Sequence, residues 1–246
     1  MNEYFFELHT DLPREGPGDA ASTLKALRLM ENLPAHPHIL DVGCGPGMQT
    51  IELANHMDGS IIAVDTHQPF LDRLQERVNR AGLADRVKVR NESMFDLKFE
   101  RDSFDVIWSE GAIYIIGFEK GLREFKPLLK QGGYAAVTEI TWLKPDPPAE
   151  IKIFWDKNYP AMNTLEENLA ALANAGYREI GHFVLPDSCW WDDYYHPLEK
   201  RIEMLSKKYA DNAEALDMLN EERREIELFS KYSDQYGYVF YVMQVQ

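Results

Sequence analysis

Cysteine and basic residues are scarce in this chain, and both shortages exclude classes of protein. Cys44 and Cys189 are the only cysteines among 246 residues, which is too few for a disulfide framework and favours a reducing compartment. The 26 lysine and arginine residues face 41 acidic ones, so the formal net charge is −15 at pH 7. Because nucleic acids are polyanions, this charge predicts that the chain has no nucleic-acid partner.

Long apolar runs are also missing. A membrane-spanning helix needs roughly 20 consecutive apolar residues, and no stretch of the sequence approaches that length. The first four residues, MNEY, lack the basic start of a signal peptide. The histidines are scattered and no pair has metal-ligand spacing, so we predict no metal site. These observations favour a cytoplasmic protein that does not associate with a membrane.

The most informative stretch is residues 39–50, which read ILDVGCGPGMQT. A short apolar run and an acid precede three glycines at alternate positions, where a strand is expected to turn into a helix. Gly43, Gly45 and Gly47 lack the Cβ that would keep a ligand away from the backbone, so the chain can turn sharply while its amides approach a bound molecule. This pattern predicts a loop that binds a nucleotide-type cofactor.

The spacing of the glycines indicates which kind of cofactor. A dinucleotide fingerprint, G-x-G-x-x-G, would need a glycine at Met48, and here the third glycine comes one residue early. Asp41, two residues before the first glycine, would repel a phosphate and attract an ammonium group. A zwitterionic amino acid moiety therefore suits the loop better than a pyrophosphate.

These residues resemble the first motif of the class I S-adenosylmethionine-dependent methyltransferases, which is an acid followed by G-x-G-x-G. The resemblance covers about residues 39–184, and several motifs fall in order at compatible spacings. It implies that the methionine part of the cofactor is cradled by one loop, formed by Asp41, Gly43, Cys44, Gly45 and Gly47.

The resemblance continues downstream of this loop. It implies that Asp65, at the end of the next strand, accepts hydrogen bonds from the ribose hydroxyls, for which a carboxylate is suited, and that Thr66 lies beside the adenine. Ser93 and Met94 stand where the family usually places an acid and a small residue against the adenine edge. Ser109 begins the loop after the fourth strand and is also expected near the cofactor.

Alternating strand and helix patterns predict the fold. Apolar runs indicate strands at 38–42, 60–65, 86–91, 104–108, 132–141, 178–185 and 236–245, and helical periodicity indicates helices at 19–32, 47–57, 67–81, 117–129 and 164–175. We therefore predict an α/β protein with a Rossmann-like, seven-stranded, doubly wound sheet and a C-terminal antiparallel hairpin. Ligands of such sheets bind at the carboxyl ends of the strands.

The chain is predicted to form a single methyltransferase domain over residues 1–246. Its expected parts are an N-terminal leader and helix (1–33), a cofactor-binding core (34–185), a helical insertion between the last two strands (186–235) and the last strand (236–246). The insertion is read as two helices, near 195–209 and 211–230. Its many acidic residues are typical of a solvated helix surface, although some of them could repel wrong substrates.

Candidate acceptor residues lie on loops at the carboxyl end of the sheet and in the insertion. Glu110 follows the fourth strand and is the candidate catalytic group, which would orient or deprotonate the acceptor. The other pocket candidates are Tyr114, Glu139, Trp142, Trp191 and Tyr195. The aromatic ones could bind a cationic or planar acceptor by cation–π contact or stacking, or they could pack a helix onto the domain.

The leading functional hypothesis is S-adenosylmethionine-dependent methyl transfer to a small-molecule acceptor by in-line displacement, with S-adenosylhomocysteine as the product. Holding the nucleophile near the methyl group and excluding water can provide much of the rate in such a reaction. A non-catalytic S-adenosylmethionine-binding module and a nicotinamide-dependent oxidoreductase are the alternatives. The sequence leaves the acceptor, the methylated atom and the oligomeric state open.

Overall fold

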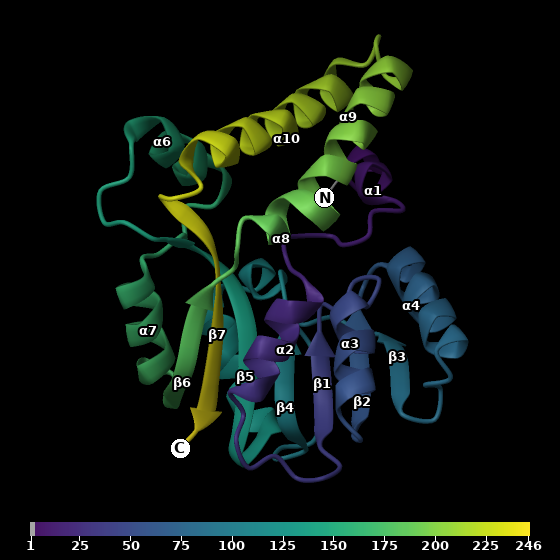
Figure 1. The fold of residues 1–246 in the computed structure, drawn as a ribbon, viewed down its shortest axis with the longest axis vertical. Coiled ribbons are helices and arrows are strands. Elements are labelled where there is room, and N and C mark those ends of the chain that lie inside the picture. The colour runs from purple at the N-terminus through teal and green to yellow at the C-terminus, as the bar shows by residue number, and fades with distance from the viewer. Residues whose placement is uncertain (1–2) are drawn as a thin grey trace.

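A seven-stranded sheet runs through the protein in the order β3-β2-β1-β4-β5-β7-β6 (Figure 1). The computed structural model describes residues 3–246, so the first two residues of the predicted leader lie outside the described part. Strands β1 to β5 are parallel, and β7 runs antiparallel between β5 and β6. The strands are β1 (His38–Val42), β2 (Ser60–Asp65), β3 (Val87–Asn91), β4 (Phe104–Ser109), β5 (Leu129–Trp142), β6 (Tyr177–Val184) and β7 (Tyr236–Val245). The predicted Rossmann-like sheet and its antiparallel C-terminal strand are confirmed.

Helices cover both faces of the sheet because its strands are apolar on both sides. In β1, Ile39 packs with α2 (Ala20–Arg28), α3 (Met48–His56) and α4 (Gln68–Arg80), whereas the next residue, Leu40, packs with the opposite layer. That layer contains α5 (Phe118–Phe125) and α7 (Leu165–Asn174). Alternate strand residues therefore belong to two separate apolar clusters, one on each face of the sheet, as a buried parallel sheet requires.

The N-terminal leader contains a helix that the sequence did not predict, α1 (Glu3–His9). Its Glu7 carboxylate accepts hydrogen bonds from Lys208 Nζ and from the Tyr209 hydroxyl, each at 2.6 Å. The guanidinium of Arg201 donates to the carbonyl of Leu8 at 3.2 Å. The start of the chain is therefore held by residues about two hundred positions later in the sequence.

The segment between β6 and β7 is helical, as expected, but its entry differs from the prediction. It comprises the short α8 (Ser188–Trp190), a π-helical turn η3 (Trp191–Tyr195), α9 (His196–Lys208) and α10 (Ala213–Tyr232). Figure 1 shows α9 and α10 side by side beyond the carboxyl ends of the parallel strands, with α1 next to α9. A second unpredicted helix, α6 (Ala149–Asn158), begins directly after the proline-rich turn that ends β5.

Candidate functional site

The glycine loop after β1 is shaped by two positions that only glycine can occupy. Gly43 and Gly47 have φ values of +71° and +82°, in the left-handed region. A Cβ on Gly43 would lie 2.3 Å from Ala112 Cβ, and one on Gly47 would lie 2.1 Å from Leu74 Cδ1. The sharp turn therefore lets the loop pack against the segment after β4 and against α4.

A cavity opens where β1, β2, β3 and β4 end, as the sequence predicts for this class of sheet. Its lining includes part of the predicted cofactor set, namely Gly43, Cys44, Gly45, Asp65, Thr66, Ser93 and Met94, together with the acceptor candidates Glu110 and Tyr114. Side chains from four separate loops thus meet in one place.

Asp65 is held in a fixed orientation at the end of β2. Its Oδ2 accepts a hydrogen bond from the amide of Gly45 at 3.0 Å, and its Oδ1 accepts one from the amide of His67 at 2.9 Å. The side chain lines the cavity and is only half-buried. Because each carboxylate oxygen can accept more than one hydrogen bond, Asp65 retains capacity for two hydroxyl donors of a ligand.

Asp41 does not line the cavity, contrary to the expectation that its charge would meet the ligand directly. It is fully buried, and its Oδ2 accepts a hydrogen bond from the Thr50 hydroxyl at 2.6 Å. Burial raises the pKa of Asp41 to about 7. Gln49 lies between Asp41 and the cavity, since its amide approaches Asp41 at 3.4 Å and it also lines the cavity. Asp41 therefore holds the glycine loop from the side that faces away from the cavity.

Gly47 and Ser109 are likewise absent from the cavity wall. Gly47 is the residue before α3 and packs on α4, while the Ser109 hydroxyl donates to the carbonyl of Val42 at 2.9 Å. Both contacts join the ends of neighbouring elements, so these residues support the loop without facing its ligand.

Glu110 lines the cavity, but its carboxylate is already engaged by the protein. Its Oε1 accepts hydrogen bonds from Trp108 Nε1 and the Thr23 hydroxyl, each at 2.8 Å. Its Oε2 pairs with Arg14 Nη1 at 3.3 Å, and only 4% of the side chain is exposed. Such a saturated carboxylate favours a role in fixing the leader over a role in accepting a proton.

The leader contributes a wall of the cavity that sequence analysis did not assign residue by residue. Phe6 stacks on His67 with ring centroids 4.1 Å apart, and His9 and Glu15 also line the cavity. Burial raises the pKa of Glu15 to about 8, although the guanidinium of Arg73, 3.7 Å away, acts in the opposite direction. The signal in the sequence was the unusual aromatic and acidic composition of the first fifteen residues.

Two pocket candidates at the end of β5 lie outside the cavity. Glu139 is buried and accepts a hydrogen bond from the Tyr159 hydroxyl at 2.7 Å. Trp142 is buried against Tyr236, with ring centroids 6.1 Å apart. Trp142 is therefore a packing residue, which corrects its expected place in the pocket.

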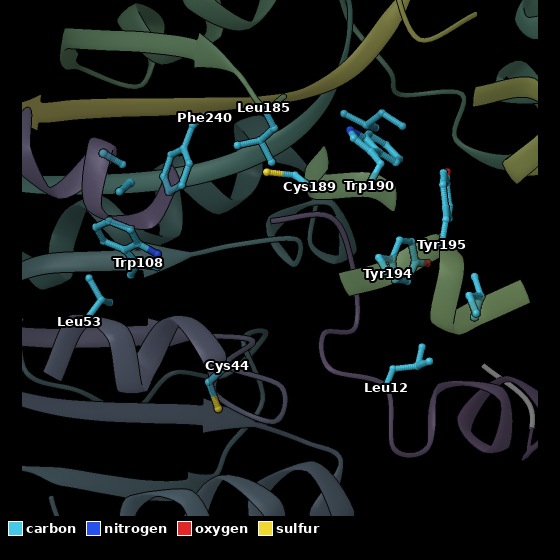
Figure 2. Close-up of a cluster of buried hydrophobic side chains, with 14 of the residues drawn as sticks. Leu12, Cys44, Leu53, Trp108, Leu185, Cys189, Trp190, Tyr194, Tyr195 and Phe240 are labelled. Atoms are coloured by element: carbon cyan, nitrogen blue, oxygen red, sulfur yellow. The ribbon is translucent and has the colours of Figure 1, made fainter. Parts of the chain in front are cut away.

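The aromatic candidates of the insertion also form a core. Figure 2 shows Trp190, Tyr194 and Tyr195 together on the segment that precedes α9. Tyr195 is fully buried and lies 5.5 Å from the ring of Trp190, and Trp191 packs on Tyr195 at the same centroid distance. Phe229 of α10 completes the cluster. Trp191 and Tyr195 do not line the cavity, and their contacts fit the alternative in which these rings hold the helices of the insertion together.

The residues present fit an adenosyl group joined to an amino acid. The Asp65 carboxylate suits a ribose diol, Met94 and Phe95 provide apolar contact for a base, and the Gly45 backbone, at φ +51°, faces the cavity without a Cβ. None of the lysines in the described residues lines this cavity, and Arg14, which does, is paired with Glu110. The lining therefore suits a nucleoside better than a pyrophosphate.

Comparison with known proteins agrees with this geometry. Residues 39–133 match the model of a methyltransferase domain. The chain is 26% identical over 196 residues to a sterol 24-C-methyltransferase of Neurospora crassa, and the alignment covers 76% of this chain and 51% of that protein. It is 31% identical over 111 residues to a sarcosine/dimethylglycine N-methyltransferase of Aphanothece halophytica, covering 45% of this chain and 40% of that one.

A solved structure extends the likeness to the whole fold. A methyltransferase from Thiobacillus denitrificans, crystallised with S-adenosyl-L-homocysteine, superposes with a TM-score of 0.83 at 18% identity, covering 100% of this chain and 99% of the other. The chain spans 51% and 59% of the length of two sterol methyltransferases that it matches. Within the described residues, no helix combines the length and the apolar character needed to cross a bilayer.

Proposed function

Because the chain belongs to the class I S-adenosylmethionine-dependent methyltransferases, we propose that it transfers a methyl group from S-adenosylmethionine to a small-molecule acceptor. When bound, S-adenosylmethionine supplies a methyl group already activated on a sulfonium sulfur. The protein's own task is then to hold donor and acceptor close together and to exclude water, for which effective molarities contribute up to roughly 7–11 kcal/mol.

The cofactor residues have distinct proposed roles. Asp65 accepts hydrogen bonds from the ribose hydroxyls. The amides of Gly45 and His67 fix the orientation of its carboxylate, and this is the single observation that carries the proposal. Met94 contacts the adenine, and the backbone around Gly45 approaches the amino acid part. Asp41, Gly47 and Ser109 hold these groups in place from behind.

The leader is proposed to cover the bound cofactor. Phe6, His9 and Glu15 line the cavity from this side, and Arg14 fastens the leader to Glu110. Glu110 acts in this proposal as a positioning residue. Tyr114, which lines the cavity from the loop after β4, contacts the acceptor.

A small-molecule acceptor is supported by the relatives, which are named for sterol and for sarcosine and dimethylglycine substrates. The strongly acidic composition disfavours a nucleic-acid acceptor. Two unpaired cysteines, both buried, fit the reducing conditions of the cytoplasm, where we propose that the protein acts.

Calorimetry tests this function directly. S-adenosylmethionine and S-adenosylhomocysteine are expected to bind at micromolar or lower concentration, and NAD is expected not to bind. A screen of amine, hydroxyl and thiol acceptors with S-adenosylhomocysteine release as the readout then identifies turnover. Absence of binding by both sulfur compounds would refute the proposed function.

A further inference from the structure

Three carboxylates whose charges raise the pKa of Tyr114 have no cationic partner in the described part of the chain. They are Glu139 on β5 and Glu222 and Glu225 on α10, and none of them forms an ion pair with a lysine, arginine or histidine within residues 3–246. Burial raises the pKa of all three, and the charge of Glu225 raises the pKa of Glu222 further. An unpaired buried carboxylate is unfavourable unless something compensates it.

Glu139 is one of the buried acids that have an oxygen without a hydrogen-bond partner among the described residues. The residue is only 2% exposed, and its Oε1 accepts a hydrogen bond from the Tyr159 hydroxyl. Its Oε2 is buried and has no hydrogen-bond partner. Buried polar atoms of proteins almost always have a partner, so this oxygen points to a donor or a cation that a ligand would bring.

Aromatic rings surround these carboxylates. The rings of Tyr114 and Tyr159 lie 6.0 Å apart in an edge-to-face arrangement. Burial and the nearby charges of Glu225, Glu139 and Glu222 raise the pKa of Tyr114 to about 12. Burial raises the pKa of two other phenols, and nearby carboxylates raise it further: Glu222 and Glu225 act on Tyr194, and Glu139 and Glu225 act on Tyr238.

Tyr114 connects this acidic–aromatic cluster with the cofactor cavity. It lines that cavity, and 36% of the residue is exposed, while its ring packs against that of Tyr159, whose hydroxyl donates to Glu139. A ligand that contacts the cluster therefore lies beside the place proposed for the methyl donor.

The cations nearest in sequence are engaged elsewhere, and the guanidinium of Arg223 donates to Asn220 and Ser206. Lys157 of α6 pairs with Glu221 at 2.5 Å, and Arg224 and Lys231 of α10 both pair with Glu150. These pairs lie at the surface, with 35–65% of each side chain exposed. These cations therefore do not neutralise Glu139, Glu222 or Glu225, and a cation for these carboxylates would have to come from a ligand.

We propose that Glu139, Glu222 and Glu225, with Tyr114 and Tyr159, form the acceptor subsite, and that the acceptor carries a positively charged alkylammonium group. Tyrosine faces attract such groups by cation–π contact, and carboxylates attract them by charge. A bound cation would favour the charged form of these carboxylates and lower their pKa, whereas an anionic acceptor would disfavour that form further. This inference rests on the proposed methyltransferase function.

The test compares two probes of nearly equal shape and different charge. Choline and its uncharged carbon analogue, 3,3-dimethyl-1-butanol, are titrated by calorimetry into the full-length protein, with and without saturating S-adenosylhomocysteine. We expect choline to bind at least about tenfold more tightly than the analogue. Potassium chloride at matched ionic strength controls for a simple inorganic cation.

Substitutions locate the binding. Glu139→Gln and Glu222→Gln keep the side-chain shape and remove the charge, and each is expected to weaken choline binding by about fivefold or more. Glu214→Gln, at an exposed position of the same helix, is the matched control and is expected to change nothing. Thermal melting checks folding, and the two inward variants are expected to melt no lower than the original protein at pH 8.5, because they remove unpaired buried charge.

The outcomes separate the two proposals. Equal affinity for both probes, no choline binding, or choline binding unaffected by Glu139→Gln and Glu222→Gln overturns the subsite, even when S-adenosylhomocysteine binds normally. Failure of S-adenosylhomocysteine to bind overturns the proposed function instead. Displacement of choline by potassium alone would show a general cation site and would also overturn the acceptor assignment.

Discussion

Glu110 and Thr23 are joined by a hydrogen bond of 2.8 Å that links the end of β4 to the first turn of α2. The same carboxylate oxygen accepts the indole N–H of Trp108, and the other oxygen pairs with Arg14. This arrangement places three donors on one buried carboxylate, two of them, Arg14 and Thr23, from a distant part of the sequence. It also distinguishes two possible roles of Glu110, positioning and proton transfer, which the sequence alone does not distinguish.

Substitution of Glu110 distinguishes a positioning role from proton transfer. Glu110→Ala leaves the indole N–H of Trp108 without an acceptor and leaves the Thr23 hydroxyl only the carbonyl of Asp19, so it is expected to lower the free energy of unfolding by roughly 2–4 kcal/mol. Glu110→Gln retains an acceptor oxygen and is expected to keep most of kcat with an unchanged pH profile. Urea unfolding and pH–rate measurements check both. Loss of kcat in the stable Gln variant, with a shifted pH profile, would restore the catalytic role.

Asp65 is predicted to dominate recognition of the nucleoside. Asp65→Ala removes charge-assisted hydrogen bonds worth roughly 1.5–3 kcal/mol, so S-adenosylhomocysteine affinity is expected to fall by about 10- to 150-fold. Asp72→Ala, at an exposed position on α4, is the control. Calorimetry with both variants measures the effect, and equal affinities would mean that Asp65 does not face the ribose.

The buried pair of Thr50 and Asp41 is predicted to stabilise the glycine loop. Thr50→Val deletes the hydroxyl that donates to Asp41 at 2.6 Å and is expected to destabilise the protein by roughly 1–3 kcal/mol. It is also expected to weaken cofactor binding, because the loop shifts. Thr50→Ser keeps the hydroxyl and is expected to behave nearly as the original protein in denaturant unfolding and in calorimetry.

Stability is predicted to fall as the pH rises from mildly acidic to alkaline. Burial raises the pKa of Glu15 and Glu139 from 4.5 to about 8 in the folded protein. Their contribution to stability is therefore fully present below about pH 4.5 and is lost as the pH rises through 8. His9 acts oppositely at low pH, because burial lowers its pKa to about 4 and it must lose its proton on folding.

Urea unfolding of the ligand-free protein at pH 6 and pH 9 measures this slope. Glu139→Gln removes one of the titrating groups, so the difference in stability between the two pH values is expected to shrink. A variant that shows the same slope as the original protein would mean that Glu139 ionises freely in the folded state.

The sheet and the cofactor loop could be predicted from sequence because their signals are local. The apolar strands, the three glycines and Asp65 are each specified within a few residues, and the observed strand bounds differ little from those expected. Helix α1 could not be predicted in this way. Glu7 finds Lys208 and Tyr209 only in the folded chain, and no local pattern records that contact.

The insertion shows where residue type is insufficient. An acidic helix was expected to present its charges to solvent, and Glu214 and Glu221 are indeed exposed. Glu222 and Glu225 turn inward, and Tyr195 donates to Glu225 at 2.9 Å. Trp191 and Tyr195 were pocket candidates because of their residue type alone. In a sequence, an aromatic stripe that binds a ligand cannot be distinguished from one that packs against another helix.

The attachment of α1 to α9 has a consequence for how the protein is made. Glu7 leaves the ribosome long before Lys208 and Tyr209 exist, so α1 lacks these two partners during most of translation. The wall that α1 adds to the cavity is therefore completed after strands β1 to β4, whose ends form the rest of the site. A chain released before residue 208 would contain Asp65 but would lack the contacts that hold α1 beside the cavity.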